Sequence, residues 1–228
     1  FRPTKTRDAY KKIWQPEGSP LIINTYKIAK SLKEKTGWNI KVAMRYQEPS
    51  FKKIINYYKI NNIKKIIVVP LYPHNAISTT LSTKIELNSI IKKIYPELKI
   101  KIIKPFYNHP LYIRALSYTI KPYIDKIDKL MFSYHGIPER HLIKGDNTKK
   151  HCLQSINCCA ENCIQSNNCY KSNVLTTSKL CAKELGLPQQ KWMSSFQSRV
   201  SIIGSKWLNP YTDIELKKLP QSGIKNIA

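Results

Sequence analysis

The chain has 228 residues, of which 42% are apolar, enough to build the core of one large domain or two small ones. No run approaches the roughly 18 apolar residues that a membrane span needs, and no signal-peptide pattern opens the sequence, so we expect a cytoplasmic protein. The net charge of +25 would ordinarily indicate a polyanionic partner. The lysines are spread over nearly every segment, however, so compositional drift explains the charge better and no nucleic-acid partner is expected.

The first part of the chain alternates between helical and extended patterns. Ser19 and Pro20 are a favourable N-cap and first-turn residue, and Gly37 follows as a C-terminal cap, which predicts a helix between them. Residues 38–46 are predicted to form a strand. A second helix is expected over residues 50–59.

The same alternation continues through the rest of the chain. The β-branched run at 63–69 predicts a strand that is covered on both faces. Periodicity and flanking Ser, Thr, Pro and Gly residues predict helices over about 78–94, 110–127 and 171–185 and a short one from 212, and strands over 98–103, 130–134, 192–196 and from about 224.

Alternating strands and helices with short connections predict an α/β fold with parallel sheets and right-handed crossovers. Two Rossmann-like halves, each a doubly wound parallel sheet, fit the pattern better than one long sheet. We place the first half at residues 1–108 and the second at 109–228, around a shared cleft.

One strand of the second half ends abruptly at a histidine. The apolar run at 130–134 stops at His135, and Gly136 and Pro138 follow as residues that reverse the chain. In open α/β sheets, ligands bind at the carboxyl ends of the strands. An imidazole at that edge can accept a proton or bind a metal near neutral pH.

Four segments should meet at this edge, because each ends a strand or opens the loop after it. They are residues 45–46, 70–80, 135–140 and 197–199. Together they supply aromatic, polar and cationic side chains, which suit a pocket for a flat, partly apolar ligand that carries carboxylates.

These segments resemble motifs of the ferrochelatase family. Residues 133–140 are Ser-Tyr-His-Gly-Ile-Pro-Glu-Arg, residues 195–199 are Ser-Phe-Gln-Ser-Arg, and residues 207–213 are Trp-Leu-Asn-Pro-Tyr-Thr-Asp. Upstream, Met-Arg-Tyr at 44–46 and Val-Pro-Leu-Tyr-Pro at 69–73 match as well. The motifs follow the family's order over the whole chain.

The resemblance implies a chelatase-like fold and a lyase that inserts Fe²⁺ into protoporphyrin IX to form protohaem, the last step of haem biosynthesis. His135 corresponds to the family's catalytic histidine, which takes pyrrole protons or binds the incoming iron, and a neutral imidazole suits either role. The positions that the resemblance assigns to porphyrin binding are Arg45, Tyr46, Tyr72, Ser78, Thr79, Gln197, Ser198 and Trp207.

The sequence departs from the family pattern in three places. The chain lacks the family's first strand and stops before its second catalytic group, a glutamate, so we expect a fragment that is inactive by itself. The segment at 200–206 is about two residues longer than usual, which can displace Trp207. His74 and Asn75 replace a glutamine and an aromatic residue; we expect His74 to be a loop histidine, with a second iron contact as the alternative.

All six cysteines lie between residues 151 and 182, and five of them fall in a Cys-rich loop at 146–170. In a reducing compartment, such close spacing indicates metal binding. Some members of the family carry a cysteine-rich insertion here, and some bind a [2Fe–2S] cluster, whose usual ligands are four thiolates. Structural zinc and unligated thiols remain alternatives, and Cys181 is expected in the core. The candidate ligands are Cys152, Cys158, Cys163 and Cys169.

Two other functions stay open. One is the insertion of another metal, such as cobalt, by an enzyme of the same fold, although the motifs at 197–199 and 211–213 favour iron. The other is porphyrin or haem binding by a degenerate chain without activity. The patterns carry no information on oligomeric state, and peripheral membrane contact stays open.

Overall fold

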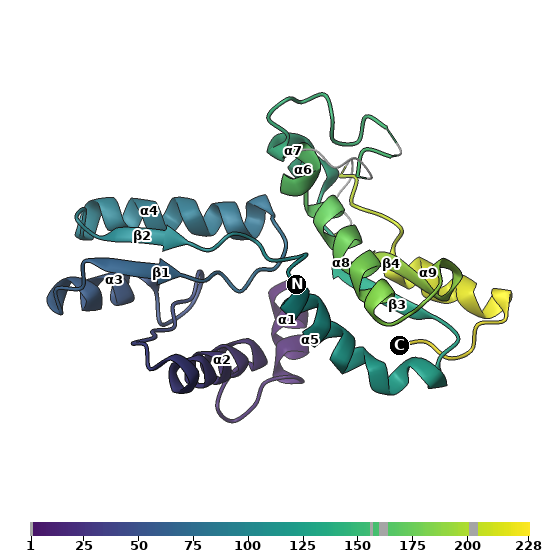
Figure 1. Ribbon diagram of the computed structural model, residues 1–228, viewed down its shortest axis with the longest axis horizontal. Helices are drawn as coiled ribbons and strands as arrows, with labels where there is room; N and C mark the ends of the chain where they lie inside the picture. The colour runs from purple at the N-terminus through teal and green to yellow at the C-terminus, as the bar shows by residue number, and fades with distance from the viewer. Residues whose placement is uncertain (1, 156, 160–163, 201–204) are drawn as a thin grey trace. The chain divides into compact units, whose positions relative to one another are not determined.

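The computed structural model describes residues 2–155, 157–159, 164–200 and 205–228 (Figure 1). Its contacts divide the chain into two compact units, Phe1–Ile66 with Ile85–Ile100, and Ile67–Lys84 with Lys101–Ala228. The structure combines helices with parallel strands, which confirms the predicted α/β class. Residues 67–84 belong to the second unit, whereas the sequence analysis places them in the first half, at residues 1–108.

The helices of the first 100 residues begin and end largely where their caps predict. α2 (Pro20–Thr36) follows Ser19, whose hydroxyl accepts a hydrogen bond from the Ile22 N–H at 3.3 Å. It ends at Gly37, whose φ of 68° lets its N–H reach the Lys33 carbonyl oxygen at 2.8 Å. The other helices here are α1 (Arg2–Lys11), α3 (Phe51–Ile60) and α4 (Ser82–Ile94), the last preceded by a π-helical turn at Ile77–Leu81.

Residues 38–46 do not form the predicted strand. Within the described chain they pair only through an isolated bridge between Met44 and Ser50. An extended segment becomes a strand only where a neighbour satisfies its N–H and C=O groups, and no described segment pairs with this one along its length. Trp38 is accordingly 59% exposed.

β1 (Lys65–Val68) and β2 (Lys99–Ile102) form a two-stranded parallel sheet. The Lys99 N–H donates to the Lys64 carbonyl oxygen at 3.0 Å. The predicted burial of β1 on both faces is wrong, because alternate residues are exposed and Ile67 keeps 49% of its surface. Alternating burial means that one face of this sheet is packed and the other is open in the described part of the chain.

The second unit contains the sheet that carries His135 (Figure 1). β3 (Leu130–His135) and β4 (Trp192–Gln197) are parallel and pair residue by residue, with His135 opposite Gln197. The last residues of the chain run beside β3, where the Ala228 carbonyl oxygen accepts an N–H at 2.8 Å. The strand that the sequence predicts from about residue 224 is present only as an isolated parallel bridge between Lys129 and Ile227.

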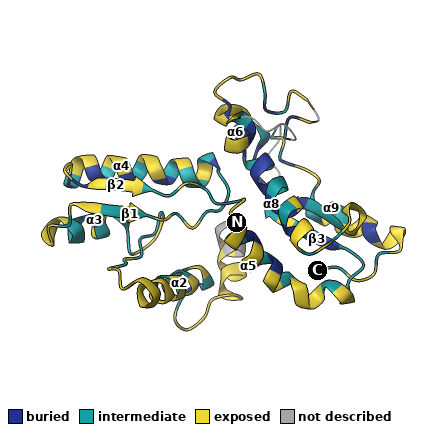
Figure 2. Ribbon diagram, in the orientation of Figure 1, coloured by how far each residue is buried: buried dark blue, intermediate teal, exposed yellow. Residues whose placement is uncertain are grey.

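Helix α8 (Tyr170–Glu184) carries a long row of buried residues (Figure 2). Cys181 has no exposed surface, which confirms that it is a core residue. In the described chain, no helix is both long and apolar enough to cross a membrane. The core around the first turns of α8 consists of Ile137, Leu142, Cys152, Cys169, Val174, Phe196 and Leu208.

The remaining helices of this unit are α5 (Pro110–Ile120), α6 (Glu139–Gly145), α7 (Ile164–Asn168) and α9 (Thr212–Lys218), with 3-10 turns at Lys121–Lys126, Gln189–Lys191 and Leu219–Ser222.

Hydroxyl groups join β3 and β4 to the start of α9. Thr212 Oγ1 lies 2.9 Å from Ser133 Oγ and 2.8 Å from Ser195 Oγ. Ser195 is fully buried, and Thr212 is the partner of its hydroxyl among the described residues. A buried hydroxyl without a partner costs about 1–3 kcal/mol, so this contact stabilises the end of the sheet.

Thr212→Val should lower the free energy of unfolding by about 1–3 kcal/mol, because the Ser195 hydroxyl loses its partner while the shape of the side chain is kept. Thr119→Val, at an exposed position near the end of α5, is the matched control and should change this free energy by less than about 0.5 kcal/mol. Urea denaturation followed by circular dichroism measures both. Equal stability of Thr212→Val and the wild type would contradict this role.

Candidate functional site

His135 ends β3, and its side chain is exposed. Its Nδ1 lies 2.7 Å from the Gly136 carbonyl oxygen, which can only accept a hydrogen bond. In the neutral ring, Nδ1 therefore carries the proton, and Nε2 keeps a free lone pair. Nε2 has no hydrogen-bond partner among the described residues, so the turn presents an imidazole that can accept a proton or bind a metal through this atom.

Gly136 holds this turn against β4. Its N–H donates to the Gln197 carbonyl oxygen at 2.7 Å. A Cβ at Gly136 would lie 2.9 Å from the same oxygen and 3.6 Å from the Trp207 ring, and real Cβ atoms do not approach an oxygen so closely. The close approach of the two strand ends therefore requires glycine.

Trp207 lies beside the same turn. It forms an isolated antiparallel bridge with Pro138, and the N–H of Leu208 donates to the Ile137 carbonyl oxygen at 3.0 Å. The preceding segment at 200–206, which the sequence marks as long, falls partly outside the described residues. Trp207 Nε1 is buried and has no hydrogen-bond partner in the described chain, which is unusual for a buried donor.

The residues after β4 are tied to α9. Ser198 has a positive φ of 64°, and its hydroxyl donates to Gln197 Oε1. The Arg199 guanidinium lies 3.0 Å from the Asp213 carboxylate and 4.1 Å from the centre of the Tyr211 ring. Arg199 therefore has two partners at the start of α9, which leaves Gln197 and Ser198 as the exposed polar groups nearest the end of β4.

His74 anchors the loop after β1 to α8. Its Nε2 lies 3.0 Å from Thr177 Oγ1, and its ring meets the rings of Tyr134 and Tyr170 edge-on, with centroids 5.5 and 6.0 Å away. Burial lowers the pKa of His74 to about 4, so the ring is neutral at pH 7. These contacts favour a structural role, as the sequence predicts, over an iron contact.

Three predicted substrate residues lie in this loop. Ser78 is exposed, and Thr79 lies in the π-helical turn with its Oγ1 3.5 Å from the Ala76 carbonyl oxygen. Tyr72 is half-buried and precedes His74 by two residues. Because His74 packs on Tyr134, the loop is attached within the second unit to the strand that carries His135.

Arg45 and Tyr46 belong to the first unit. The Arg45 guanidinium lies 4.5 Å from the centre of the Tyr46 ring and 3.9 Å from the Glu86 carboxylate. Arg45 lines a cavity of about 500 Å³ together with Lys52 and Lys93. Its Nε is buried without a partner among the described residues, so a donor is available in this basic cavity.

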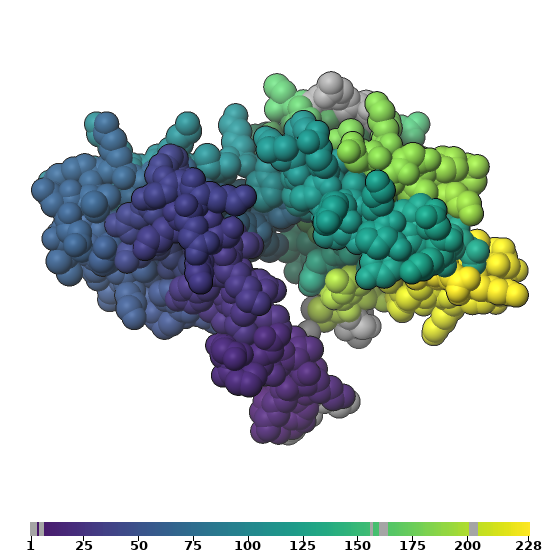
Figure 3. All heavy atoms as spheres, turned by 60° about the horizontal axis from the view of Figure 1, so that its bottom comes forward, coloured from purple at the N-terminus to yellow at the C-terminus, as the bar shows by residue number. Residues whose placement is uncertain are grey.

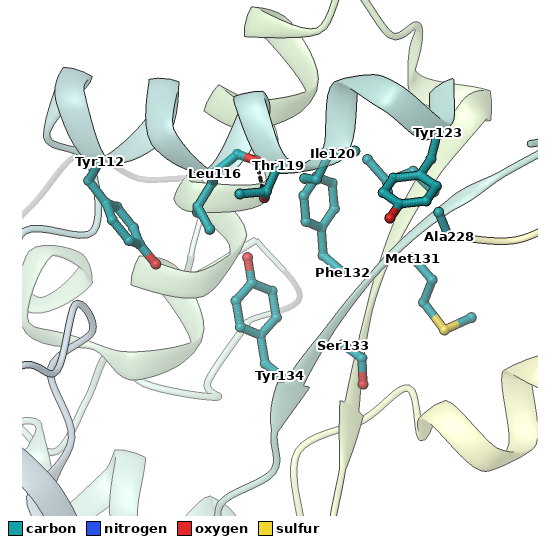
Figure 4. A pocket seen from close by; sticks show the side chains of 11 residues that line it. Tyr112, Leu116, Thr119, Ile120, Tyr123, Met131, Phe132, Ser133, Tyr134 and Ala228 are labelled. Carbon is teal, nitrogen blue, oxygen red and sulfur yellow. Dashed lines mark hydrogen bonds between the residues drawn. The ribbon is translucent and has the colours of Figure 1, made fainter. Parts of the chain in front are cut away.

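A second cavity, of about 340 Å³, lies between α5 and β3 (Figure 4). In this view Tyr134 points toward α5 and Ser133 points away from it, and the Tyr134 hydroxyl lies 2.9 Å from Ser178 Oγ. Ala228 is one of its lining residues, and in the space-filling view the yellow C-terminal part of the chain lies beside the teal part that includes α5 (Figure 3). His135 does not line this cavity, which is therefore separate from the histidine turn.

Cys169, the residue before α8, is the described thiol of the Cys-rich loop that other thiols influence most. Cys159 and Cys152 both lie near enough to its sulfur to shift its pKa, and Cys158 Sγ lies 3.9 Å from Cys159 Sγ. The hydrogen bond from Cys159 lowers the pKa of Cys169 to about 6. Burial, with Cys169 nearby, raises the pKa of Cys152 to about 12.

Asp146 fixes the start of this loop. Its carboxylate accepts hydrogen bonds from the N–H groups of Cys152 at 3.0 Å, Thr148 at 3.0 Å and His151 at 2.9 Å. These bonds, that from Cys152 foremost, hold the pKa of Asp146 well below its ordinary value.

The predicted ligand set is only partly described. Cys163 lies outside the described residues, and Cys159, which the sequence analysis left out, contacts Cys169. In the described ranges, no three His, Cys, Asp or Glu side chains are arranged around one point as a metal site requires. The donors nevertheless have the right chemistry, because thiolates are the ligands of both [2Fe–2S] clusters and structural zinc.

The ferrochelatase family model matches residues 1–228. The chain belongs to the ferrochelatase family. It is 37% identical to the ferrochelatase of Pseudomonas entomophila (strain L48) and 36% identical to that of Pseudomonas fluorescens (strain Pf0-1), over 99% of this chain and 67% of each relative. The ferrochelatase of Pseudomonas syringae pv. tomato (strain ATCC BAA-871 / DC3000) is 34% identical over 99% of this chain and 66% of its own length. The chain thus spans about two thirds of these ferrochelatases.

Tyr170 is a residue beside the His135 turn that the sequence analysis missed. Its hydroxyl donates to the His135 carbonyl oxygen at 2.8 Å. Neither periodicity nor a motif marks it, because the contact joins residues 35 positions apart. Only the packing of α8 against β3 brings them together.

Gly136→Ala should lower the free energy of unfolding by about 1–3 kcal/mol, because the new methyl group meets the Gln197 carbonyl oxygen. Gly145→Ala is the control, since the nearest atom to its Cβ would be Ile77 Cδ1 at 3.9 Å, and it should leave stability unchanged or raise it. Urea denaturation compares the two. If both variants match the wild type, the turn does not depend on glycine.

Proposed function

We propose that the protein inserts Fe²⁺ into protoporphyrin IX to form protohaem, with His135 as the side chain that meets the reacting atoms. The observation that carries this is the orientation of its imidazole, with Nδ1 bonded to the Gly136 carbonyl oxygen at 2.7 Å and Nε2 free at the end of a parallel strand. Membership of the ferrochelatase family supports the reaction class.

The tautomer of His135 suits this reaction. Metal insertion releases two protons from the pyrrole nitrogens as Fe²⁺ enters the macrocycle. The Nε2 lone pair can accept one of them, which makes an imidazolium, and the other passes to water. The Nδ1–H bond to the Gly136 carbonyl oxygen then becomes charge-assisted and stabilises the cation. His135 needs no reorientation in this step.

The porphyrin is proposed to contact residues of several strand ends and loops. Cationic and hydroxyl groups suit its propionates, and aromatic rings suit the flat macrocycle. The unpaired indole N–H of Trp207 and the unpaired Nε of Arg45 are donors that a carboxylate or another acceptor could satisfy. The proposed set is Arg45, Tyr46, Tyr72, Ser78, Thr79, Gln197, Ser198 and Trp207.

We further propose that the Cys-rich loop holds a metal, either as a [2Fe–2S] cluster or as structural zinc. The contacts of Cys152 and Cys159 with Cys169 support this, and a fourth thiolate would come from Cys158 or Cys163. When bound, the metal would cross-link the loop to the start of α8. A cytoplasmic location accompanies this proposal, because a reducing compartment keeps clustered thiols available for a metal.

His135→Ala in the intact protein should lower the rate of haem formation by roughly 100-fold or more, the contribution expected of a positioned acid–base group. Porphyrin binding should be retained, because the residues proposed to hold the ring are unchanged. Haem absorbance and quenching of protein fluorescence measure the two on one sample.

His109→Ala is the control for this experiment. His109 caps α5, where its side chain accepts a hydrogen bond from the Leu111 N–H at 3.3 Å. The His109→Ala variant should therefore insert iron as the wild type does. Haem formation by His135→Ala at the rate of the wild type would overturn the assignment.

Protein purified without oxygen should contain stoichiometric iron and sulfide, with visible absorption, or stoichiometric zinc without colour. Cys169→Ser should lose the metal and melt at a lower temperature, because two other thiols of the loop, Cys152 and Cys159, lie near this residue. Cys181→Ser is the control: Cys181 lies in the core on α8, with its sulfur 3.1 Å from Ser117 Oγ, and this variant should keep the metal. A metal-free protein that is as stable as expected for the folded chain would contradict the proposal that the Cys-rich loop binds a metal.

A further inference from the structure

The peptide group that joins His135 to Gly136 is held on both sides. Its carbonyl oxygen accepts the Tyr170 hydroxyl at 2.8 Å, and its N–H donates to the Gln197 carbonyl oxygen at 2.7 Å. Because a peptide group is planar, two hydrogen bonds at opposite edges fix its rotation about the chain. The direction of this plane sets where the His135 side chain leaves the strand.

The other backbone contacts of this turn, at Ile137 and Pro138, lie beyond Gly136 and do not hold this peptide group directly. Gly136 has no side chain, so its backbone angles are intrinsically free. Its own carbonyl oxygen is the acceptor that selects the His135 tautomer, 2.7 Å from Nδ1. A rotation of the peptide before Gly136 would therefore change both the direction of the imidazole and the bond that keeps Nε2 unprotonated.

Tyr170 is itself firmly held. Its ring meets the His74 ring edge-on at 6.0 Å, with 85° between the planes, and it packs on the core of the second unit. His74 is fixed in turn by Thr177, whose Oγ1 lies 3.0 Å from its Nε2. The Tyr170 hydroxyl is thus a donor in a defined position rather than a mobile surface group.

The helix that carries Tyr170 is also anchored close to its first turn. Asn173 is fully buried; its Oδ1 accepts the Asn75 N–H at 3.0 Å, and its Nδ2 donates to the Asn167 carbonyl oxygen at 2.9 Å. A side chain can orient a reacting group only if its own support is rigid, and this one is supported on two sides.

We propose that Tyr170 is a positioning residue for iron insertion: by holding the His135 carbonyl oxygen, its hydroxyl fixes the peptide from which the reacting imidazole projects. The inference rests on the proposed function. Tyr170 touches neither substrate nor metal in this role, and it acts only through the main chain of His135.

Tyr170→Phe in the intact protein tests this role, because it removes the hydroxyl and keeps the ring against His74. We expect kcat for haem formation to fall roughly tenfold, the effect of one hydrogen bond on the barrier, while the KM for porphyrin changes by less than about twofold. Tyr118→Phe, on α5 with 80% of its surface exposed, is the matched control and should behave as the wild type.

A second readout separates positioning from simple loss of stability. In ¹³C-resolved NMR spectra of the histidine rings, His135 should give one sharp set of signals in the wild type and broadened or multiple signals in Tyr170→Phe. Wild-type kcat in Tyr170→Phe overturns the inference, as does a fall in activity with an unchanged His135 signal. A wild-type protein without iron insertion overturns the proposed function instead, and the NMR comparison then still tests whether Tyr170 orients His135.

Discussion

The hydrogen bond from the Gly136 N–H to the Gln197 carbonyl oxygen is the contact on which the histidine site depends. It extends the pairing of β3 and β4 one residue beyond His135, and its length of 2.7 Å leaves no room for a Cβ. The turn that follows can therefore bring Trp207 beside Gly136 and present His135 outward. A site for a proton acceptor is built here from backbone geometry more than from charged neighbours.

The first turn of α8 supports three features at once. Cys169, just before it, lies near the thiols of Cys152 and Cys159, Tyr170 holds the His135 carbonyl oxygen, and Asn173 fixes the loop that begins after β1. These contacts explain why α8 is the most strongly packed helix of its unit although its sequence is rich in Ser, Thr and Asn. Its buried polar side chains are hydrogen-bonded to loops, to α7 and to β3 and β4, which satisfies them where a purely apolar helix would only fill space.

The sequence predicts those parts of the fold that depend on local signals. Ser19 and Gly37 mark the ends of α2 because capping needs only neighbouring backbone groups. The strand that ends at His135 is predicted because an apolar run stops at a polar residue and a glycine. Residues 38–46 have an equally good strand pattern but no described partner along their length, and a pattern cannot supply one. The exposed face of β1 was missed for the same reason.

The residues of the candidate site fall into the same two groups, those that sequence patterns predict and those that only tertiary packing brings together. His135, Gln197 and Trp207 follow from motifs that resemble a family, and the structure places them around one turn. Tyr170 carries no such signal, and the spacing of the clustered cysteines does not show that Cys159 lies near Cys169, since these contacts depend on how a helix and a loop pack. His74 shows the intermediate case: its place in a loop is evident from the sequence, whereas its edge-on contacts with two tyrosine rings come from tertiary structure.

The central claim is that the turn presents His135 with a proton on Nδ1 and a free lone pair on Nε2. Long-range ¹H–¹⁵N NMR spectra at neutral pH distinguish the two tautomers directly, and the His135 signals can be assigned from their loss in His135→Ala. The hydrogen bond to Gly136 predicts the Nδ1-protonated form. A ring protonated on Nε2, with Nδ1 as the acceptor, would contradict the account.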